Sequence, residues 1–148
     1  MANLLVIGYG NSLRGDDGVG RRLAEAVAAW RAPDIAVLSL HQLVPELVED
    51  LQDAERVLFV DAVAGVGDVH LRKFVAFPGN RSLNHHADPG GLLALATELY
   101  GHCPEAWLLT IPGSNFDLSE DISPGAQANM TKALALVKDF YKGTKEHA

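Results

Sequence analysis

The sequence predicts an α/β fold: a three-layer α/β/α sandwich around a twisted, mostly parallel sheet of about five or six strands. Along the chain, short apolar runs alternate with segments in which apolar residues recur at helical spacing, which is the pattern of repeated β-α-β units. The chain has 148 residues, of which 48% are hydrophobic, so it is long enough for one such domain and short for two. We therefore expect a single domain over residues 1–148.

In the first half of the chain, strands and helices alternate and each ends at a recognisable signal. The first expected strand is the apolar run 4–8, which leads into a glycine-rich turn. The helix after this turn ends before Pro33, because proline disfavours helical geometry in the preceding residue. Apolar runs at 35–40 and 56–63 predict the second and third strands, with a short helix at 45–51 between them. The buried face of the first helix is formed by apolar residues at helical spacing: Val19, Leu23, Val27 and Trp30.

In the second half, residues 69–77 alternate in polarity like an exposed or edge strand. They follow two glycines after the third strand closely enough to be its hairpin partner. Asp88 and Pro89 open another helix, and Gly101 lies near its end. Its expected buried face consists of Leu92, Ala96 and Leu99.

The last strand is expected at 106–111, followed by a C-terminal helix. Ser123 is placed to cap this helix and Pro124 to occupy its first position. Residues 142–148 are expected to be a frayed tail. The apolar face of the helix consists of Met130, Leu134, Val137 and Tyr141.

Composition and charge exclude several classes of function. The formal net charge of −7 argues against binding to nucleic acid or to an anionic membrane, both of which require a basic surface, and favours a protein or cationic partner. Cys103 is the single cysteine, so no intrachain disulfide is possible. With no basic leader, no run of membrane-spanning length and no coiled-coil seam, we expect a cytoplasmic monomer.

The turn GYGNSLRGDDGVG (residues 8–20) does not match a nucleotide-binding loop. The dinucleotide pattern fails where Leu13 replaces its third glycine, and a P-loop fails where Asp16 and Asp17 replace its Lys-Ser/Thr pair. Two carboxylates at this position would also repel a phosphate, so we expect no nucleotide cofactor. They would suit either the positive end of the following helix, as caps, or a metal ion.

Asp61 follows the buried residues of the third strand, in the run RVLFVDAVAG. Ligands of open α/β sheets bind at the carboxyl ends of the strands, and if the first and third strands are neighbours, Asp17 and Asp61 face one another there. Two facing carboxylates either share a proton or hold a divalent cation. The alternative is that Asp61 is an ordinary surface-turn residue.

The segment SLNHHADPGG supplies two histidines, His85 and His86, just before a helix. Imidazole is a common ligand of transition metals, and two carboxylates with one histidine form an open site for zinc, nickel or manganese. The alternative is that these histidines are merely exposed on a loop.

Five segments together resemble one known family, the hydrogenase maturation proteases, which process the large subunit of nickel-iron hydrogenases. They cover almost the whole chain in the same order. They are LLVIGYGNSLRGDDGVG, HQLVPELVEDL, RVLFVDAV, NHHADPGGLLALATELYG and NFDLSEDISPGA. The resemblance implies an α/β/α sandwich and a divalent-metal site formed by an acidic residue of the first loop, the strand-ending Asp and a loop His.

Carried over to this chain, the resemblance implies that Asp17, Asp61 and His86 are the metal ligands. His86 is preferred to His85 because it keeps the spacing to Pro104. Asp17 and Asp61 are also the expected catalytic residues together with Asp16, which alternatively orients the loop or caps the helix. The implied reaction removes a C-terminal extension from a hydrogenase large-subunit precursor, and the metal is nickel supplied by that substrate.

Two other functions remain as alternatives. A non-catalytic nickel-binding or chaperone-like module would use the same three ligands for binding alone. Peptidyl-tRNA hydrolases begin with a similar Gly-x-Gly-Asn turn, but a basic, histidine-bearing segment follows it there, whereas this chain continues with Asp16 and Asp17.

Overall fold

A computed structural model of the chain describes residues 2–75 and 88–146. These residues contain one five-stranded sheet with the strand order β2-β1-β3-β5-β4, in which β4 runs antiparallel to β5 and the other neighbours are parallel. The strand count and the mostly parallel arrangement agree with the sequence prediction. The strands are β1 (Ala2–Tyr9), β2 (Ile35–Leu40), β3 (Ala54–Ala64), β4 (His70–Phe74) and β5 (Glu105–Gly113).

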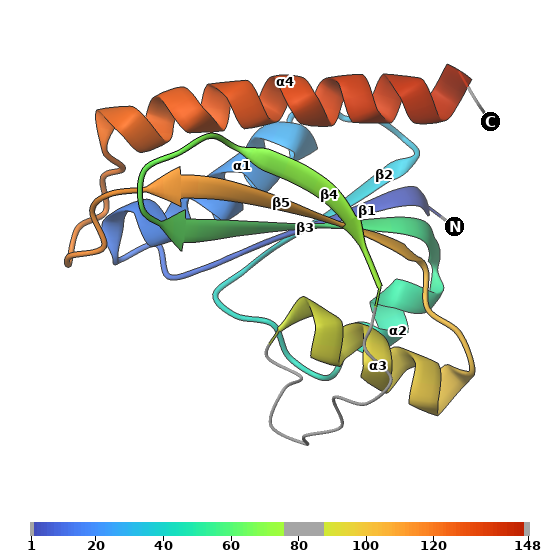
Figure 1. Ribbon diagram of the computed structural model, residues 1–148. Helices are drawn as coiled ribbons and strands as arrows, with labels where there is room; N and C mark the ends of the chain where they lie inside the picture. Colours follow the sequence, from blue (N-terminus) through green and yellow to red (C-terminus); the bar gives the residue numbers. More distant parts are fainter. Residues whose placement is uncertain (1, 76–87, 147–148) are drawn as a thin grey trace.

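Helices cover both faces of this sheet, so the predicted three-layer sandwich is confirmed. Figure 1 shows α1 and α4 on one face and α2 and α3 on the other. A short 3-10 helix, η1, precedes α1. No helix in the described part of the chain is both long enough and apolar enough to cross a membrane. The bounds are η1 (Gly15–Gly18), α1 (Val19–Ala28), α2 (Leu47–Gln52), α3 (Pro89–Tyr100) and α4 (Pro124–Glu146).

The core consists of two apolar clusters, one on each face of the sheet. Alternate residues of a strand point to opposite faces, so the central strands β1 and β3 contribute to both clusters. Toward α1 and α4 they contribute Leu4, Val6, Leu58 and Val60. Toward α2 and α3 they contribute Leu5, Ile7, Val57 and Phe59.

The predicted adjacency of the first and third strands is confirmed. β1 and β3 are parallel neighbours, and their register pairs Gly8 with Val60. The residues that follow these two, at the carboxyl ends of both strands, therefore come out side by side. This register decides which side chains can form a site.

The hairpin expected between the third strand and the edge strand is wrong. β4 pairs with β5, antiparallel, with His70 opposite Thr110. The reason is that both edges of β3 are already occupied, by β1 and by β5. The connection after β3 therefore carries the chain past the end of β5 to its far edge, as Figure 1 shows.

Three helix-end signals agree with the sequence, and three expectations along the helices are wrong. Trp30, expected on the buried face of the first helix, lies beyond α1, which ends at Ala28 before the chain turns at Arg31 with a φ of +53°. The Asp88 side chain caps α3 by accepting a hydrogen bond from the Gly91 amide, and Gly101 ends it in a left-handed conformation. The Ser123 hydroxyl accepts from the Ala126 amide at the start of α4. Leu99, expected to be buried, is exposed because the whole last turn of α3 extends beyond its packing surface. Residues 142–146, expected to be a tail, continue α4.

Helix α1 lies unusually close to the sheet because two glycines face each other. A methyl group on Gly8 would lie 2.2 Å from the Gly20 carbonyl oxygen, and one on Gly20 would lie 2.6 Å from the Val60 carbonyl oxygen. Contacts this short do not occur between real atoms, so only glycine fits at either position. The close approach fixes where α1 begins relative to the ends of β1 and β3.

We expect Gly20→Ala to lower the free energy of unfolding by about 1–3 kcal/mol, because α1 must move away from the Val60 carbonyl to admit the methyl group. Gly143→Ala is the matched control. It makes the same change in a helix where nothing lies within 4 Å of the added methyl group, and it should be neutral or stabilising by about 0.5–1 kcal/mol. Urea unfolding of the two variants tests this, and equal effects would contradict the close-packing argument.

Candidate active site

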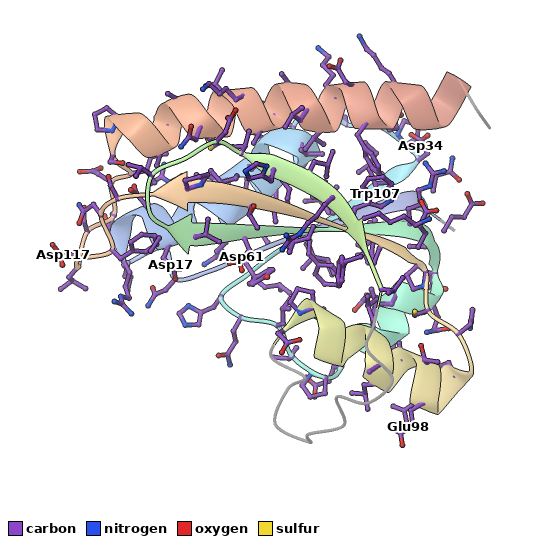
Figure 2. All side chains as sticks on the ribbon, viewed as in Figure 1. Asp17, Asp34, Asp61, Glu98, Trp107 and Asp117 are labelled. Carbon is purple, nitrogen blue, oxygen red and sulfur yellow. The ribbon has the colours of Figure 1, made fainter. Side chains whose placement is uncertain are left out.

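The candidate site lies at the carboxyl ends of β1 and β3. Asp17 comes from η1, in the loop after β1, and Asp61 comes from the end of β3. Figure 2 shows the two residues next to each other at the same end of the sheet. The structure therefore brings together the two carboxylates that the sequence predicts to converge.

Asp16 lies beside this pair, but its carboxylate is turned into the protein and is 0% exposed. Its Oδ2 accepts hydrogen bonds from the amides of Ser114 (2.8 Å) and Asn115 (2.9 Å) and from the Ser123 hydroxyl (2.7 Å). Its Oδ1 accepts from the Ser123 amide at 2.7 Å. Four donors from the segment between β5 and α4 therefore converge on one carboxylate.

The ionisation of Asp16 follows from these contacts. Burial by itself raises the pKa of a carboxyl group, but the hydrogen bonds from Asn115, Ser123 and Ser114 outweigh it and hold the pKa of Asp16 below its ordinary value. Packing is tight as well, since a methyl group on Gly113 would lie 2.6 Å from the Asp16 Cβ. Asp16 is thus a charged anchor inside the protein, which matches the loop-orienting alternative stated for it.

Backbone hydrogen bonds extend this anchor along the glycine-rich loop. The Gly15 amide donates to the Ser119 carbonyl, the Ser119 amide donates to the Leu13 carbonyl, and the Asp16 amide donates to the Asn115 carbonyl, each at 2.8 Å. The loop after β1 is therefore docked along the segment that precedes α4. This docking fixes the position of Asp17, the next residue.

Asp17 is partly exposed, and its Oδ2 accepts a hydrogen bond from the Asn11 amide at 2.7 Å. It does not cap the helix. The N-cap residue of α1 is Gly18, and neither η1 nor α1 has a side-chain hydrogen bond at its cap. The capping interpretation is therefore wrong for both acids of the pair, because Asp16 binds a distant segment and Asp17 binds back to its own loop.

Asp61 is partly exposed and electrostatically strained. Burial raises the pKa of Asp61 to about 6, and the negative charge of Asp17 raises it as well. Hydrogen bonds from Tyr9 and from the Ala62 amide act in the opposite direction without cancelling the rise. The effect of Asp17 on Asp61 means that the two carboxylates lie within electrostatic reach of each other.

Tyr9 is a member of the site that the sequence analysis missed. Burial raises its pKa above the ordinary value, and the charge of Asp61, a hydrogen bond to Asp61 and the charge of Asp88 raise it further. No described residue, however, contacts the buried Tyr9 hydroxyl with ordinary hydrogen-bond geometry. The Tyr9–Asp61 contact is therefore a long or bent hydrogen bond. The signal lies in the strand register, because Tyr9 follows Gly8 as Asp61 follows Val60 in the paired strands, and the sequence alone does not give that register.

The predicted third ligand lies outside the described residues, as does its neighbour: His85 and His86 both fall in the segment 76–87. Within 2–75 and 88–146, no group of three or more His, Cys, Asp or Glu side chains is arranged to hold a metal ion. The metal-ligand assignment of Asp17, Asp61 and His86 and the catalytic assignment of Asp16, Asp17 and Asp61 stay predictions.

The pair of carboxylates fits a divalent cation on chemical grounds. Two like charges within electrostatic reach raise the energy of the doubly ionised state, and a cation between them lowers it. Carboxylate oxygens bind both hard and borderline divalent metals. A cleft of about 130 Å³ lies at the same end of the sheet, between the β3–β4 connection and the start of α4, but neither Asp17 nor Asp61 lines it.

Several solved structures with the same fold are named as hydrogenase maturation enzymes. The chain is 19% identical to the hydrogenase maturating endopeptidase HybD from E. coli, with 97% of this chain and 94% of that chain covered and a TM-score of 0.77. It is 20% identical to the maturation protease HycI from Thermococcus kodakarensis KOD1, with 95% of this chain and 93% of that chain covered and a TM-score of 0.73. It is 26% identical to the hydrogenase 2 maturation peptidase from a Thaumarchaeota archaeon, with 94% of this chain and 97% of that chain covered and a TM-score of 0.65.

These similarities confirm at the level of the fold the resemblance found in the sequence. No protein-family model matches the chain, and no curated protein matches it in sequence. The likeness is thus carried by the arrangement of strands and helices over almost the whole chain.

We expect Asp16→Asn to lower the free energy of unfolding by about 2–4 kcal/mol. An amide retains one acceptor oxygen but places a donor NH₂ group against the donors that now converge on the carboxylate. Asp117→Asn, an exposed change on the same segment, should alter it by less than about 0.5 kcal/mol. Urea unfolding measures both, and a nearly neutral Asp16→Asn would contradict the anchoring role.

The raised pKa of Asp61 predicts a pH-dependent effect of Asp61→Asn. Between the ordinary value of 3.8 and about 6, the unfolded chain loses the Asp61 proton while the folded protein keeps it, so this group destabilises the fold increasingly as pH rises. At pH 7 the variant should therefore be more stable than the parent protein by about 1–2 kcal/mol, less than for a fully buried group because Asp61 is partly exposed. The difference should shrink toward pH 4. Urea unfolding across this range tests it, and a constant difference would rule out Asp61 as the cause.

Proposed function

We propose that the chain is an endopeptidase that removes a C-terminal extension from the precursor of a nickel-iron hydrogenase large subunit. The observation that carries this proposal is the meeting of Asp17 and Asp61 at the carboxyl ends of two central parallel strands. It occurs in a fold that almost the whole chain shares with hydrogenase maturation endopeptidases. The five quoted sequence segments support the same conclusion.

In this proposal the nickel ion belongs to the substrate, and Asp17, Asp61 and His86 complete its coordination. The mutual repulsion of the two carboxylates supports the assignment, because a precursor that brings a cation relieves it and an unloaded precursor does not. The charge of Asp88 raises the pKa of Tyr9, so Asp88 lies within electrostatic reach of the site. Asp88 follows His86 by two positions in the sequence, which supports His86 as the third ligand. Only a loaded precursor is then held with its scissile bond at the site.

Hydrolysis of the peptide bond needs a group that accepts a proton from the attacking water. Asp61 suits this task, because its carboxylate is partly exposed at the site and, with a pKa of about 6 in the unliganded protein, is ionised at neutral pH. A substrate nickel ion held by Asp17, Asp61 and His86 would position the substrate, and it would also supply a Lewis acid for the water or the scissile carbonyl. Asp16 orients the loop that carries Asp17 and does not contact the substrate.

The expected setting of this reaction is the cytoplasm, with the enzyme a monomer that meets its precursor transiently. The net charge of −7 supports a protein or cationic partner over nucleic acid. No nucleotide takes part in the proposed reaction.

The experiment that tests the function is incubation of the purified protein with nickel-loaded and nickel-free precursor. We expect a shortened large subunit only from the loaded form, detected by intact-mass spectrometry. Binding of the loaded precursor without cleavage would contradict a protease and favour a nickel-binding module. Equal cleavage of both forms would contradict recognition through the metal.

We expect Asp17→Asn and Asp61→Asn to be folded proteins whose processing of loaded precursor falls by at least about 100-fold. Asparagine keeps the size of the side chain but removes the charge that a cation requires. Asp53→Asn is the matched control, because Asp53 is an exposed acid just before β3, at the opposite end of that strand from Asp61. Melting temperatures measured alongside show whether the fold is intact. Near-normal cleavage by either site variant, with the fold intact, would remove that residue from the active site.

A further inference from the structure

Tyr9 is the last residue of β1, and its hydroxyl is not explained by packing alone. Its ring packs against the core cluster on the α2 and α3 face of the sheet. The hydroxyl is buried, and no residue within the described ranges gives it an ordinary hydrogen bond. A buried hydroxyl without a good partner destabilises the fold, so a phenylalanine would serve a purely structural role better.

The strand register brings this hydroxyl to Asp61. Gly8 pairs with Val60, so Tyr9 and Asp61 are the next pair across the two parallel strands. Side chains alternate along each strand, and Ile7 and Phe59, two residues earlier, face α2 and α3. Tyr9 and Asp61 therefore point to that same face from adjacent strands.

Asp61 requires a restraint at this position. The charge of Asp17 repels it, so a rotation of the Asp61 carboxylate away from Asp17 lowers the electrostatic energy. A hydroxyl donor on the neighbouring strand opposes that rotation when it binds the carboxylate. A long hydrogen bond in the unliganded protein is common at active sites and shortens when the substrate is bound.

We propose that Tyr9 is a positioning residue whose hydroxyl donates to Asp61 and holds that carboxylate in the orientation that faces Asp17. Its consequence for catalysis rests on the proposed function, but the orientation of Asp61 does not. Tyr9 contacts neither the scissile bond nor the nickel in this proposal. It acts only through Asp61.

The test compares Tyr9→Phe with Tyr141→Phe. Both changes remove a hydroxyl directed at an aspartate, since the Tyr141 hydroxyl donates to Asp34 Oδ1 at 2.5 Å. Figure 2 shows Asp34 at the opposite end of the sheet from Asp17 and Asp61. The first readout is the side-chain torsion of Asp61, measured by NMR from three-bond couplings to its β protons, which needs neither metal nor precursor.

We expect one Asp61 rotamer in the parent protein and in Tyr141→Phe, whereas Tyr9→Phe averages over two or more rotamers with an unchanged or raised melting temperature. An Asp61 torsion that stays fixed in Tyr9→Phe would overturn the proposal. So would averaging in both variants, because the effect would then not belong to the Tyr9 hydroxyl.

The second readout is cleavage of nickel-loaded precursor. Tyr9→Phe should lower kcat by about 10-fold with little change in KM, while Tyr141→Phe leaves both unchanged. A normal kcat in Tyr9→Phe would overturn the catalytic consequence. If the parent protein does not cleave the precursor, the proposed function fails, and the torsion measurement still decides whether Tyr9 positions Asp61.

Discussion

The buried carboxylate of Asp16 is the interaction on which the arrangement of the site depends. It accepts two amide hydrogen bonds where β5 ends, at Ser114 and Asn115, and an amide and a hydroxyl hydrogen bond from Ser123, where α4 begins. Three parts of the chain, the loop after β1, the end of β5 and the start of α4, are thereby joined at one charged group. Because Asp17 is the next residue, its position follows from this junction.

The two acids of the pair have opposite energetic effects although they are adjacent in sequence. Asp16 stabilises the fold in its ionised form, since its hydrogen bonds lower its pKa. The charge of Asp17 acts unfavourably on Asp61. Burial and this charge raise the pKa of Asp61 to about 6. The anchor thus holds in place a pair of charges that would otherwise separate. Such an arrangement is typical of a functional site, where local strain is maintained by the surrounding structure.

Much of the fold could be predicted from the sequence, because local patterns determine strands, helices and caps. The adjacency of the first and third strands followed from the usual strand orders of α/β sheets, and with it the meeting of Asp17 and Asp61. The partner of β4 could not be predicted, since the pairing of an edge strand depends on which edges other strands already occupy. A loop-orienting role for Asp16 could be stated as an alternative, but its hydrogen-bond donors could not be predicted, because they lie 98 to 107 positions away in the chain. Tyr9 was missed because a tyrosine at the end of a strand carries no signal of its own until its neighbour across the sheet is known.

The electrostatics of the site also bear on how a protease of this kind would avoid unwanted cleavage. Two facing carboxylates repel each other, and an ordinary peptide brings no positive charge that removes this repulsion. A segment that carries a divalent cation reverses this balance, because the cation attracts both carboxylates and removes their repulsion. In the proposed function, discrimination between loaded and unloaded substrate arises from an unfavourable interaction in the empty site as much as from a favourable one in the complex. The repulsion persists only while Asp16 and the β1–β3 register keep the two carboxylates from moving apart. In this proposal the rigidity of the fold at this end of the sheet is therefore itself a determinant of specificity.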